Sequence, residues 1–146
     1  MLFLYNTIAN KGLYVAPRLA LNEEIQTKQV ELKISEGQWD IIIDGLEQVT
    51  TVQGSAANGG TAASSFKGFP IVVAGKTGTA QTHSGSPHAW FIGFAPSRNP
   101  EYSVLVLIEN GESGGHYAAP IARKVFDFMY QNGFFNKNNE EKKKGE

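Results

Sequence analysis

A short run of side chains that could do chemistry lies at residues 76–81, where an apolar β-branched stretch continues into Lys-Thr-Gly-Thr-Ala-Gln. Side chains alternate along a strand, so Lys76 and Gly78 would share one face while Thr77 and Thr79 share the other. Lysine supplies a positive charge, threonine hydroxyls donate hydrogen bonds to an anion, and main-chain N–H groups pair with an extended ligand. The run therefore predicts a strand edge that receives an extended polar ligand.

Three strands are predicted around this run. Residues 69–79 form the first, and a polar turn over 82–87 joins it to an apolar segment over 88–94. Residues 96–100, Pro-Ser-Arg-Asn-Pro, form a hairpin connection to a third strand of β-branched and aliphatic residues over 102–108. Short connections between three consecutive strands predict an antiparallel sheet, and its first strand carries the polar run.

Helices are predicted on both sides of these strands in the sequence. One spans residues 2–10 and stops at Gly12, and a short helical turn spans 61–67. Ser35 and Gln38 form a capping box, in which each side chain satisfies an exposed N–H group of the other residue. The helix that follows runs to about residue 52 and is predicted to be a core helix, because four large apolar residues recur at helical spacing: Trp39, Ile42, Ile43 and Leu46.

Two more segments complete the predicted fold. Residues 27–34 alternate between apolar and polar types, which predicts a half-buried strand. A last helix over 117–130 has Pro120 in its first turn, where proline costs little. Helices packed on an antiparallel sheet give an α+β fold class. The side chains of the last helix that are predicted to face the sheet are Ile121, Val125, Phe128 and Met129.

The composition excludes several classes of function. The 146 residues are 41% hydrophobic, enough for a core, and include no cysteine, so disulfides and cysteine metal sites are excluded. A net charge of −1 gives no support to nucleic-acid binding, which needs a basic surface. The one lysine cluster is interleaved with glutamates in residues 136–146, which are predicted to form a charged disordered tail. No apolar stretch reaches the roughly 18 residues that span a bilayer.

Three blocks of sequence carry a resemblance to a known family: Val73–Gln81, His88–Pro96 and Gly114–Pro120. In this order they resemble the C-terminal part of the transpeptidase domain of class B penicillin-binding proteins, most closely the elongation type, penicillin-binding protein 2. The resemblance extends from about residue 1 to about residue 131. It implies that residues 1–135 form a partial penicillin-binding transpeptidase domain with the serine β-lactamase-like fold.

The resemblance also implies a reaction and roles for the polar run. In the family, a serine is acylated by the D-alanyl-D-alanine end of a peptidoglycan stem peptide and passes the acyl group to a neighbouring amine; β-lactams mimic that end. Lys76, Thr77 and Gly78 correspond to the catalytic Lys-Thr-Gly motif. Lys76 would place its charge near the substrate carboxylate and the proton relay, and Thr77 and Thr79 would bind that carboxylate. The N–H group of Thr79 would be one oxyanion-hole donor.

The partners and the location that the resemblance implies follow from cell-wall synthesis. The ligands would be peptidoglycan stem peptides and β-lactams, and cell-wall elongation proteins are further candidate partners. The site would act at the periplasmic face of the bacterial inner membrane, although no membrane anchor lies in this sequence. No cofactor and no metal are implied.

The chain departs from the family in its nucleophile motif. The family places Ser-x-x-Lys at the start of a buried helix far upstream, followed by Ser-x-Asn. Here Ser64–Lys67 lies only nine residues before Lys76, and Ser97–Asn99 follows the Lys-Thr-Gly run; both are interpreted as chance matches. The nucleophile is therefore expected in a missing N-terminal half of the domain, and this chain alone is expected to be catalytically inert.

Other interpretations of the same residues are weaker. Gly75–Thr77 also ends a phosphate-loop signature, but that motif needs a glycine where Pro70 stands and a lysine that opens a helix. The three histidines are too scattered to indicate zinc. A non-catalytic module that docks a peptide or protein on the same sheet edge is the rival from another class. A β-lactamase or penicillin sensor would share the Lys-Thr-Gly run but lack the blocks over 88–96 and 114–120.

Overall fold

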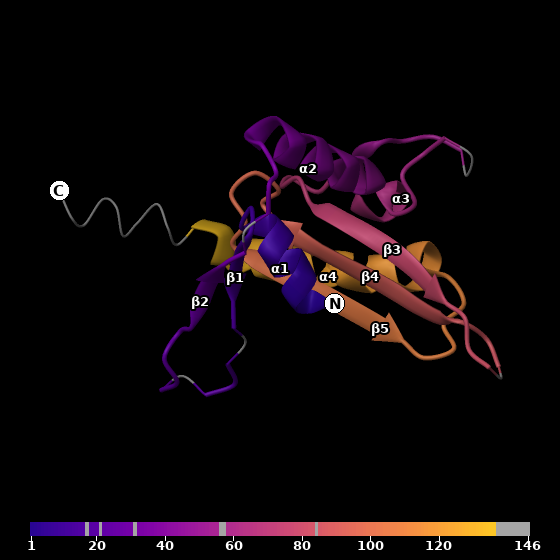
Figure 1. Cartoon of the computed structure of the whole chain (residues 1–146). Coiled ribbons are helices and arrows are strands. Elements are labelled where there is room, and N and C mark those ends of the chain that lie inside the picture. Colours follow the sequence, from indigo (N-terminus) through magenta and orange to yellow (C-terminus); the bar gives the residue numbers. More distant parts are fainter. Residues whose placement is uncertain (17, 21, 31, 56–57, 84, 137–146) are drawn as a thin grey trace.

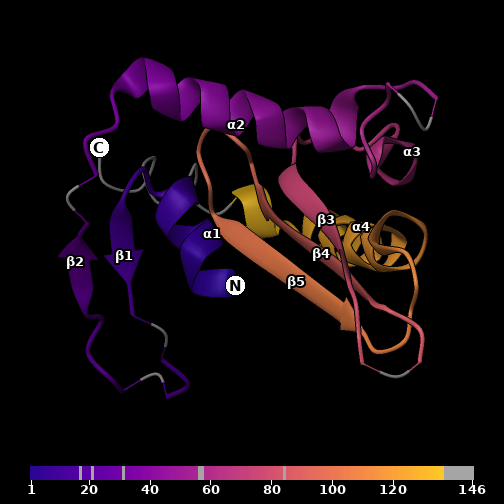
Figure 2. The same ribbon diagram turned by 45° about the vertical axis from the view of Figure 1, so that its right-hand side comes forward.

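A central antiparallel sheet carries helices on both of its faces (Figure 1). The structure is a computed structural model that describes residues 1–16, 18–20, 22–30, 32–55, 58–83 and 85–136. Helix α1 (Leu2–Ala9) covers one face of the sheet, and helix α4 (Ala119–Gln131) covers the opposite face. Helix α2 (Glu36–Thr51) runs across the sheet beside its first strand (Figure 2). The predicted α+β fold class is confirmed.

The sheet has the strand order β3-β4-β5, with β3 (Ala74–Ala80), β4 (His88–Ala95) and β5 (Tyr102–Ile108). The strands predicted over 88–94 and 102–108 are confirmed, whereas the first strand begins five residues later than predicted. Before the strand, Gly68 turns the chain with a φ of +73°, and the carbonyl oxygen of Val73 accepts the hydroxyl of Thr50 in α2. Within the described residues, β3 and β5 each have one free edge.

A small hairpin beside the main sheet corrects another prediction. Strands β1 (Leu13–Val15) and β2 (Thr27–Gln29) pair only with each other among the described strands. The predicted half-buried strand over 27–34 is therefore wrong in length and in burial, because β2 has three residues, all of them exposed. Its alternating pattern continues to Leu32, whose side chain is also exposed. An alternating pattern gives burial only where another layer covers one face, and no described element covers β2.

Two helix boundaries follow directly from local sequence. The capping box is confirmed, since Ser35 Oγ accepts the N–H of Gln38 at 3.3 Å and the N–H of Ser35 donates to Gln38 Oε1 at 2.8 Å. Trp39 and Ile43 are buried and Leu46 packs against the core, as expected for a core helix, whereas Ile42 is exposed. Helix α1 ends near the predicted Gly12, which adopts a φ of +98° that only glycine takes without strain. None of the described helices is long and apolar enough to cross a membrane.

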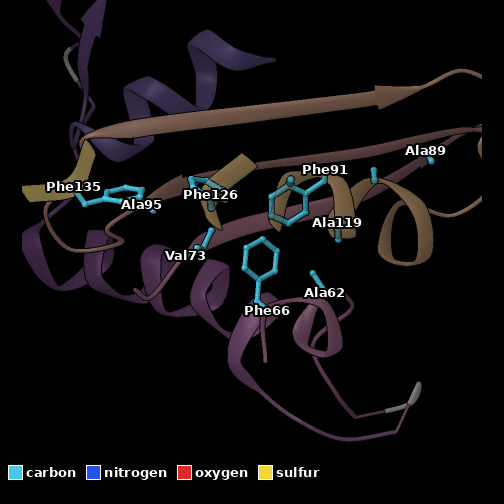
Figure 3. Close-up of a cluster of buried hydrophobic side chains, with 11 residues drawn as sticks. Ala62, Phe66, Val73, Ala89, Phe91, Ala95, Ala119, Phe126 and Phe135 are labelled. Atoms are coloured by element: carbon cyan, nitrogen blue, oxygen red, sulfur yellow. The ribbon is translucent and has the colours of Figure 1, made fainter. Parts of the chain in front are cut away.

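The main core lies between the sheet, the short helix α3 (Ala63–Phe66) and helix α4 (Figure 3). Phe66 stacks on Phe91 with ring centroids 5.3 Å apart, and Phe126 of α4 contacts Phe66 at 6.2 Å. Just before α4, the chain forms a π-helical turn, η1 (Gly114–Ala118), and a 3-10 turn, η2 (Phe134–Asn136), follows it. The rest of the predicted tail lies outside the described residues.

The face of α4 that contacts the sheet differs from the prediction. Ala119, Ala122 and Phe126 are completely buried, whereas Phe128 is 60% exposed. Of the four side chains predicted to face the sheet, only Met129 packs on the core; the other three are exposed. The small alanine side chains let the helix lie close to the sheet, so the larger apolar residues fall on its outer face.

An arginine from the β4–β5 connection ties the sheet to α2. Arg98 forms ion pairs with three carboxylates on one side of that helix: Glu47 at 2.8 Å, Asp40 at 3.3 Å, and Asp44. Hydrogen bonds to Glu47 and Asp44 raise the pKa of the Arg98 guanidinium above its ordinary value. Arg98, Asp40 and Asp44 are about half exposed, so the pairs of Arg98 with these two aspartates contribute little to stability. The buried hydrogen bond from Thr50 to the residue before β3 is the stronger tie between α2 and the sheet.

Candidate functional site

The polar run lies on β3 at the edge of the described sheet. Residues 74–80 form this strand, and Lys76 is paired with Ile92 of β4. Because Lys76 continues a strand and opens no helix, the structure gives no support to a phosphate loop. Thr77 and Thr79 line a groove to which Lys76 does not contribute, as their alternation along the strand predicts.

The threonine face borders a polar groove of about 440 Å³. Thr77 and Thr79 form one wall, and the loop before α3 and the turn η1 form the others. His116 is the only ionisable side chain among the described residues that line the groove. The groove can therefore offer hydroxyl and main-chain donors to a ligand. The other described lining residues are Gln53, Gly54, Ser55, Gly59, Gly60, Thr61, Ala63, Ser64, Ser113, Gly114 and Gly115.

Two glycines bring the walls of this groove together. A Cβ atom on Gly114 would lie 2.3 Å from the carbonyl oxygen of Trp90 and 2.6 Å from that of Gly78. A Cβ atom on Gly115 would lie 2.4 Å from the carbonyl oxygen of Thr61. No L-amino acid other than glycine fits at such distances from fixed backbone atoms. The turn η1 therefore sits directly on the Lys-Thr-Gly backbone.

Lys76 lines an apolar groove of about 340 Å³ and also a groove of about 270 Å³ that it shares with Thr61. Its Nζ atom donates to the carbonyl oxygen of Thr77 at 2.9 Å, and no carboxylate in the described part of the chain forms an ion pair with it. Trp90 lines the apolar groove, and its buried Nε1 atom has no hydrogen-bond partner among the described residues. The other lining residues are Met1, Tyr5, Thr77, Gly78, Thr79, Ala80, Ile92 and Leu105. Burial raises the pKa of the Tyr5 hydroxyl in that wall.

The two motif matches that were interpreted as chance lie in different places. Ser97 is buried in the β4–β5 connection and lines none of the described grooves beside β3. Ser64 does line the polar groove with Thr77. Lys67, however, lies past the end of the four-residue helix α3, and in the described part of the chain no hydrogen bond joins it to the Ser64 hydroxyl. A nucleophile needs a base within hydrogen-bond reach, which Ser64 lacks here.

Sequence reasoning identified the threonines but missed what surrounds them. The hydroxyl of Thr61 lies 2.7 Å from that of Thr77, although 16 residues separate them. The contact of Gly114 with Gly78 was also missed. The available signal was weak, since Gly59–Gly60 before Thr61 and the glycine pair at 114–115 indicate only that the backbone comes close to something.

The comparisons with known proteins agree with this architecture. Residues 1–127 match the family described as the penicillin binding protein transpeptidase domain. The peptidoglycan D,D-transpeptidase MrdA of Salmonella typhimurium is 31% identical over 144 residues, which cover 84% of this chain and 23% of that protein. The chain thus spans about a quarter of the length of this curated relative.

Solved structures of penicillin-binding protein 2 (PBP2) share the fold. Pseudomonas aeruginosa PBP2 in complex with WCK 5153 has a TM-score of 0.67 and 32% identity, covering 86% of this chain and 28% of that one. Helicobacter pylori PBP2 in complex with MreC has a TM-score of 0.73 and 28% identity, covering 91% of this chain and 24% of that one. Family, relatives and fold agree with the three sequence blocks, and the chain belongs to the penicillin-binding protein transpeptidase domain family, of the class B, PBP2 type.

Proposed function

We propose that this chain supplies the substrate-carboxylate side of the active site of a peptidoglycan D,D-transpeptidase, which cross-links stem peptides in bacterial cell-wall synthesis. The observation that carries the proposal is the polar groove whose wall is formed by Thr77 and Thr79 on an edge strand. Hydroxyl donors suit the terminal carboxylate of D-alanyl-D-alanine and the similar carboxylate of a β-lactam. The relatives that are peptidoglycan D,D-transpeptidases support the reaction class.

Each polar residue of β3 would have its own role in ligand binding or catalysis. The hydroxyls of Thr77 and Thr79 donate to the ligand carboxylate, and the N–H group of Thr79 donates to the oxyanion of the tetrahedral intermediate. Gly78 leaves room for the ligand backbone beside the strand. Lys76 contributes positive charge near the substrate carboxylate and the proton relay, since it lines a groove together with Thr61 of the polar groove, and no described carboxylate forms an ion pair with it.

The nucleophile serine would come from a part of the domain outside this chain. Two features support this proposal: Ser64 has no base within hydrogen-bond reach among the described residues, and the chain covers about a quarter of its relatives. The apolar groove beside Lys76 is the surface that we expect the missing N-terminal half to cover. A segment packed there would bury the exposed Met1 side chain.

The wider setting is also part of the proposal. A complete protein of this type would act at the periplasmic face of the bacterial inner membrane and bind β-lactams. A similar solved structure, penicillin-binding protein A from M. tuberculosis, is an imipenem acyl-enzyme complex, which supports a β-lactam ligand. The H. pylori PBP2 structure contains MreC, which supports a cell-wall elongation partner. The rival remains a non-catalytic module that docks an extended peptide on the same strand edge.

A chimera tests the proposal. This chain replaces the matching region of P. aeruginosa PBP2, to which it is 32% identical, and acylation by a fluorescent penicillin is followed over time. We expect labelling, and we expect Thr77→Val and Thr79→Val each to slow it by about tenfold to a hundredfold, the effect of losing a hydrogen bond to a charged group. Thr51→Val removes an exposed hydroxyl on α2 and is the matched control.

The rival predicts a different outcome. A folded chimera, judged by a cooperative thermal transition, that binds no penicillin covalently would contradict the proposal. So would unchanged labelling in both threonine variants, because the carboxylate would then be bound elsewhere.

A further inference from the structure

Thr61 contacts the proposed carboxylate-binding hydroxyl from outside the strand. Its Oγ1 atom lies 2.7 Å from Oγ1 of Thr77, a distance typical of a hydroxyl–hydroxyl hydrogen bond. Both residues line the polar groove, and Thr61 lies in the loop that joins α2 to α3. The pair thus connects a second structural element to the wall that would hold the ligand.

The backbone on both sides of Thr61 is fixed. The N–H of Gly60 donates to the carbonyl oxygen of Val52 at 2.8 Å, and the N–H of Ala62 donates to that of Val49 at 2.9 Å. Ala62 is completely buried, and a Cβ atom on Gly60 would lie 2.1 Å from the carbonyl oxygen of Gln48. The end of α2 therefore holds the backbone of Thr61 in place beside Thr77.

The number of hydroxyl protons decides the direction of this hydrogen bond when an anion is present. Each threonine hydroxyl has one proton to donate and two lone pairs to accept with. A carboxylate only accepts, so Thr77 must direct its single proton to the ligand. The hydrogen bond between the two hydroxyls is then retained only if Thr61 donates to Thr77. Such a chain polarises the Thr77 hydroxyl and strengthens its bond to the anion.

We propose that Thr61 is a positioning residue for carboxylate recognition, because its hydroxyl donates to Thr77 and directs the Thr77 proton into the groove. The inference rests on the proposed function of Thr77. A purely structural role for Thr61 would be different, since loosening the loop would weaken the binding of neutral and charged ligands alike. A positioning role affects mainly the preference for a carboxylate.

The test measures that preference in the 146-residue chain itself. N-acetyl-D-alanyl-D-alanine and its C-terminal amide are titrated separately into the ¹⁵N-labelled chain, and each Kd is obtained from the amide shifts of the groove residues. The wild type is expected to bind the carboxylate form more tightly. The preference for the carboxylate is the Kd of the amide divided by the Kd of the carboxylate form. In Thr61→Val, which keeps the shape of the side chain, this ratio is expected to fall about fivefold, since one polarising donor is lost.

Two variants separate the positioning role from loss of structure. Thr61→Ser keeps the hydroxyl and is expected to retain the wild-type ratio, and Thr51→Val loses a hydroxyl that bonds within α2 and should leave the ratio unchanged. If Thr61→Val has the wild-type ratio, the inference about Thr61 is wrong, and the proposed function of Thr77 is unaffected. Equal weakening of both ligands in Thr61→Val also overturns the inference, in favour of a structural role. A wild-type chain with no preference for the carboxylate overturns the proposed function, and the inference with it.

Discussion

Alanine at position 114 is expected to destabilise the chain by about 3 kcal/mol or more, because its Cβ atom would overlap backbone that cannot move independently. The carbonyl oxygens at 2.3 Å and 2.6 Å belong to Trp90 and Gly78, on two paired strands. Relief of the clash would move η1 away from β3 and open the polar groove. Thermal unfolding followed by circular dichroism should show a midpoint about 10 °C or more below the wild type.

Gly45→Ala is the matched control for this prediction. Gly45 is exposed within α2, and a Cβ atom there would have no neighbour within 4 Å. The substitution is therefore expected to stabilise the chain by about 1 kcal/mol through helix propensity alone. A Gly114→Ala variant that unfolds within a degree or two of the wild type would contradict the close packing of η1 on the Lys-Thr-Gly strand.

Removal of the Phe126 side chain is expected to lower the free energy of unfolding by about 3–5 kcal/mol, the range for large-to-small changes in a packed core. Phe126 is completely buried, and its ring lies 6.2 Å from that of Phe66, 6.3 Å from that of Phe69 and 6.5 Å from that of Phe135. The cavity would lie where α3, α4 and the sheet meet (Figure 3). Urea unfolding monitored by tryptophan fluorescence gives the free-energy difference.

Phe128→Ala in the same helix makes this measurement a test of which face of α4 contacts the sheet. Phe128 is 60% exposed, and its ring lies 6.4 Å from that of Phe134. Its loss is expected to lower the free energy of unfolding by less than about 1 kcal/mol. If Phe128→Ala is as costly as Phe126→Ala, the larger apolar residues of α4 face the core after all.

The fold was predictable where local signals and tertiary packing agree. Strand β5 has the predicted bounds, because its β-branched and aliphatic residues lie between clear turn residues. The contacting face of α4 was not predictable from hydrophobicity, since a close approach to the sheet selects Ala119 and Ala122 over bulkier neighbours. The alternation over 27–34 failed for a related reason: a pattern does not show whether another layer will cover it.

The candidate site was predictable along one strand and not across elements. Alternation placed Thr77 and Thr79 on one face, and the structure places both beside the polar groove. The ligand they bind stays a prediction. The contacts of Thr61 and Gly114 with this strand join residues far apart in the sequence, and neither residue type predicts which residue it will contact. Only the folded backbone brings them together.

The intact mass of this chain after incubation with benzylpenicillin tests the central claim most directly. The claim is that the chain carries the Lys-Thr-Gly side of a transpeptidase site without its nucleophile, so the mass is expected to remain that of the unmodified chain. A covalent adduct would contradict the claim. An adduct on Ser64 in particular, located by peptide mapping, would place the nucleophile in the polar groove and make the chain an enzyme by itself.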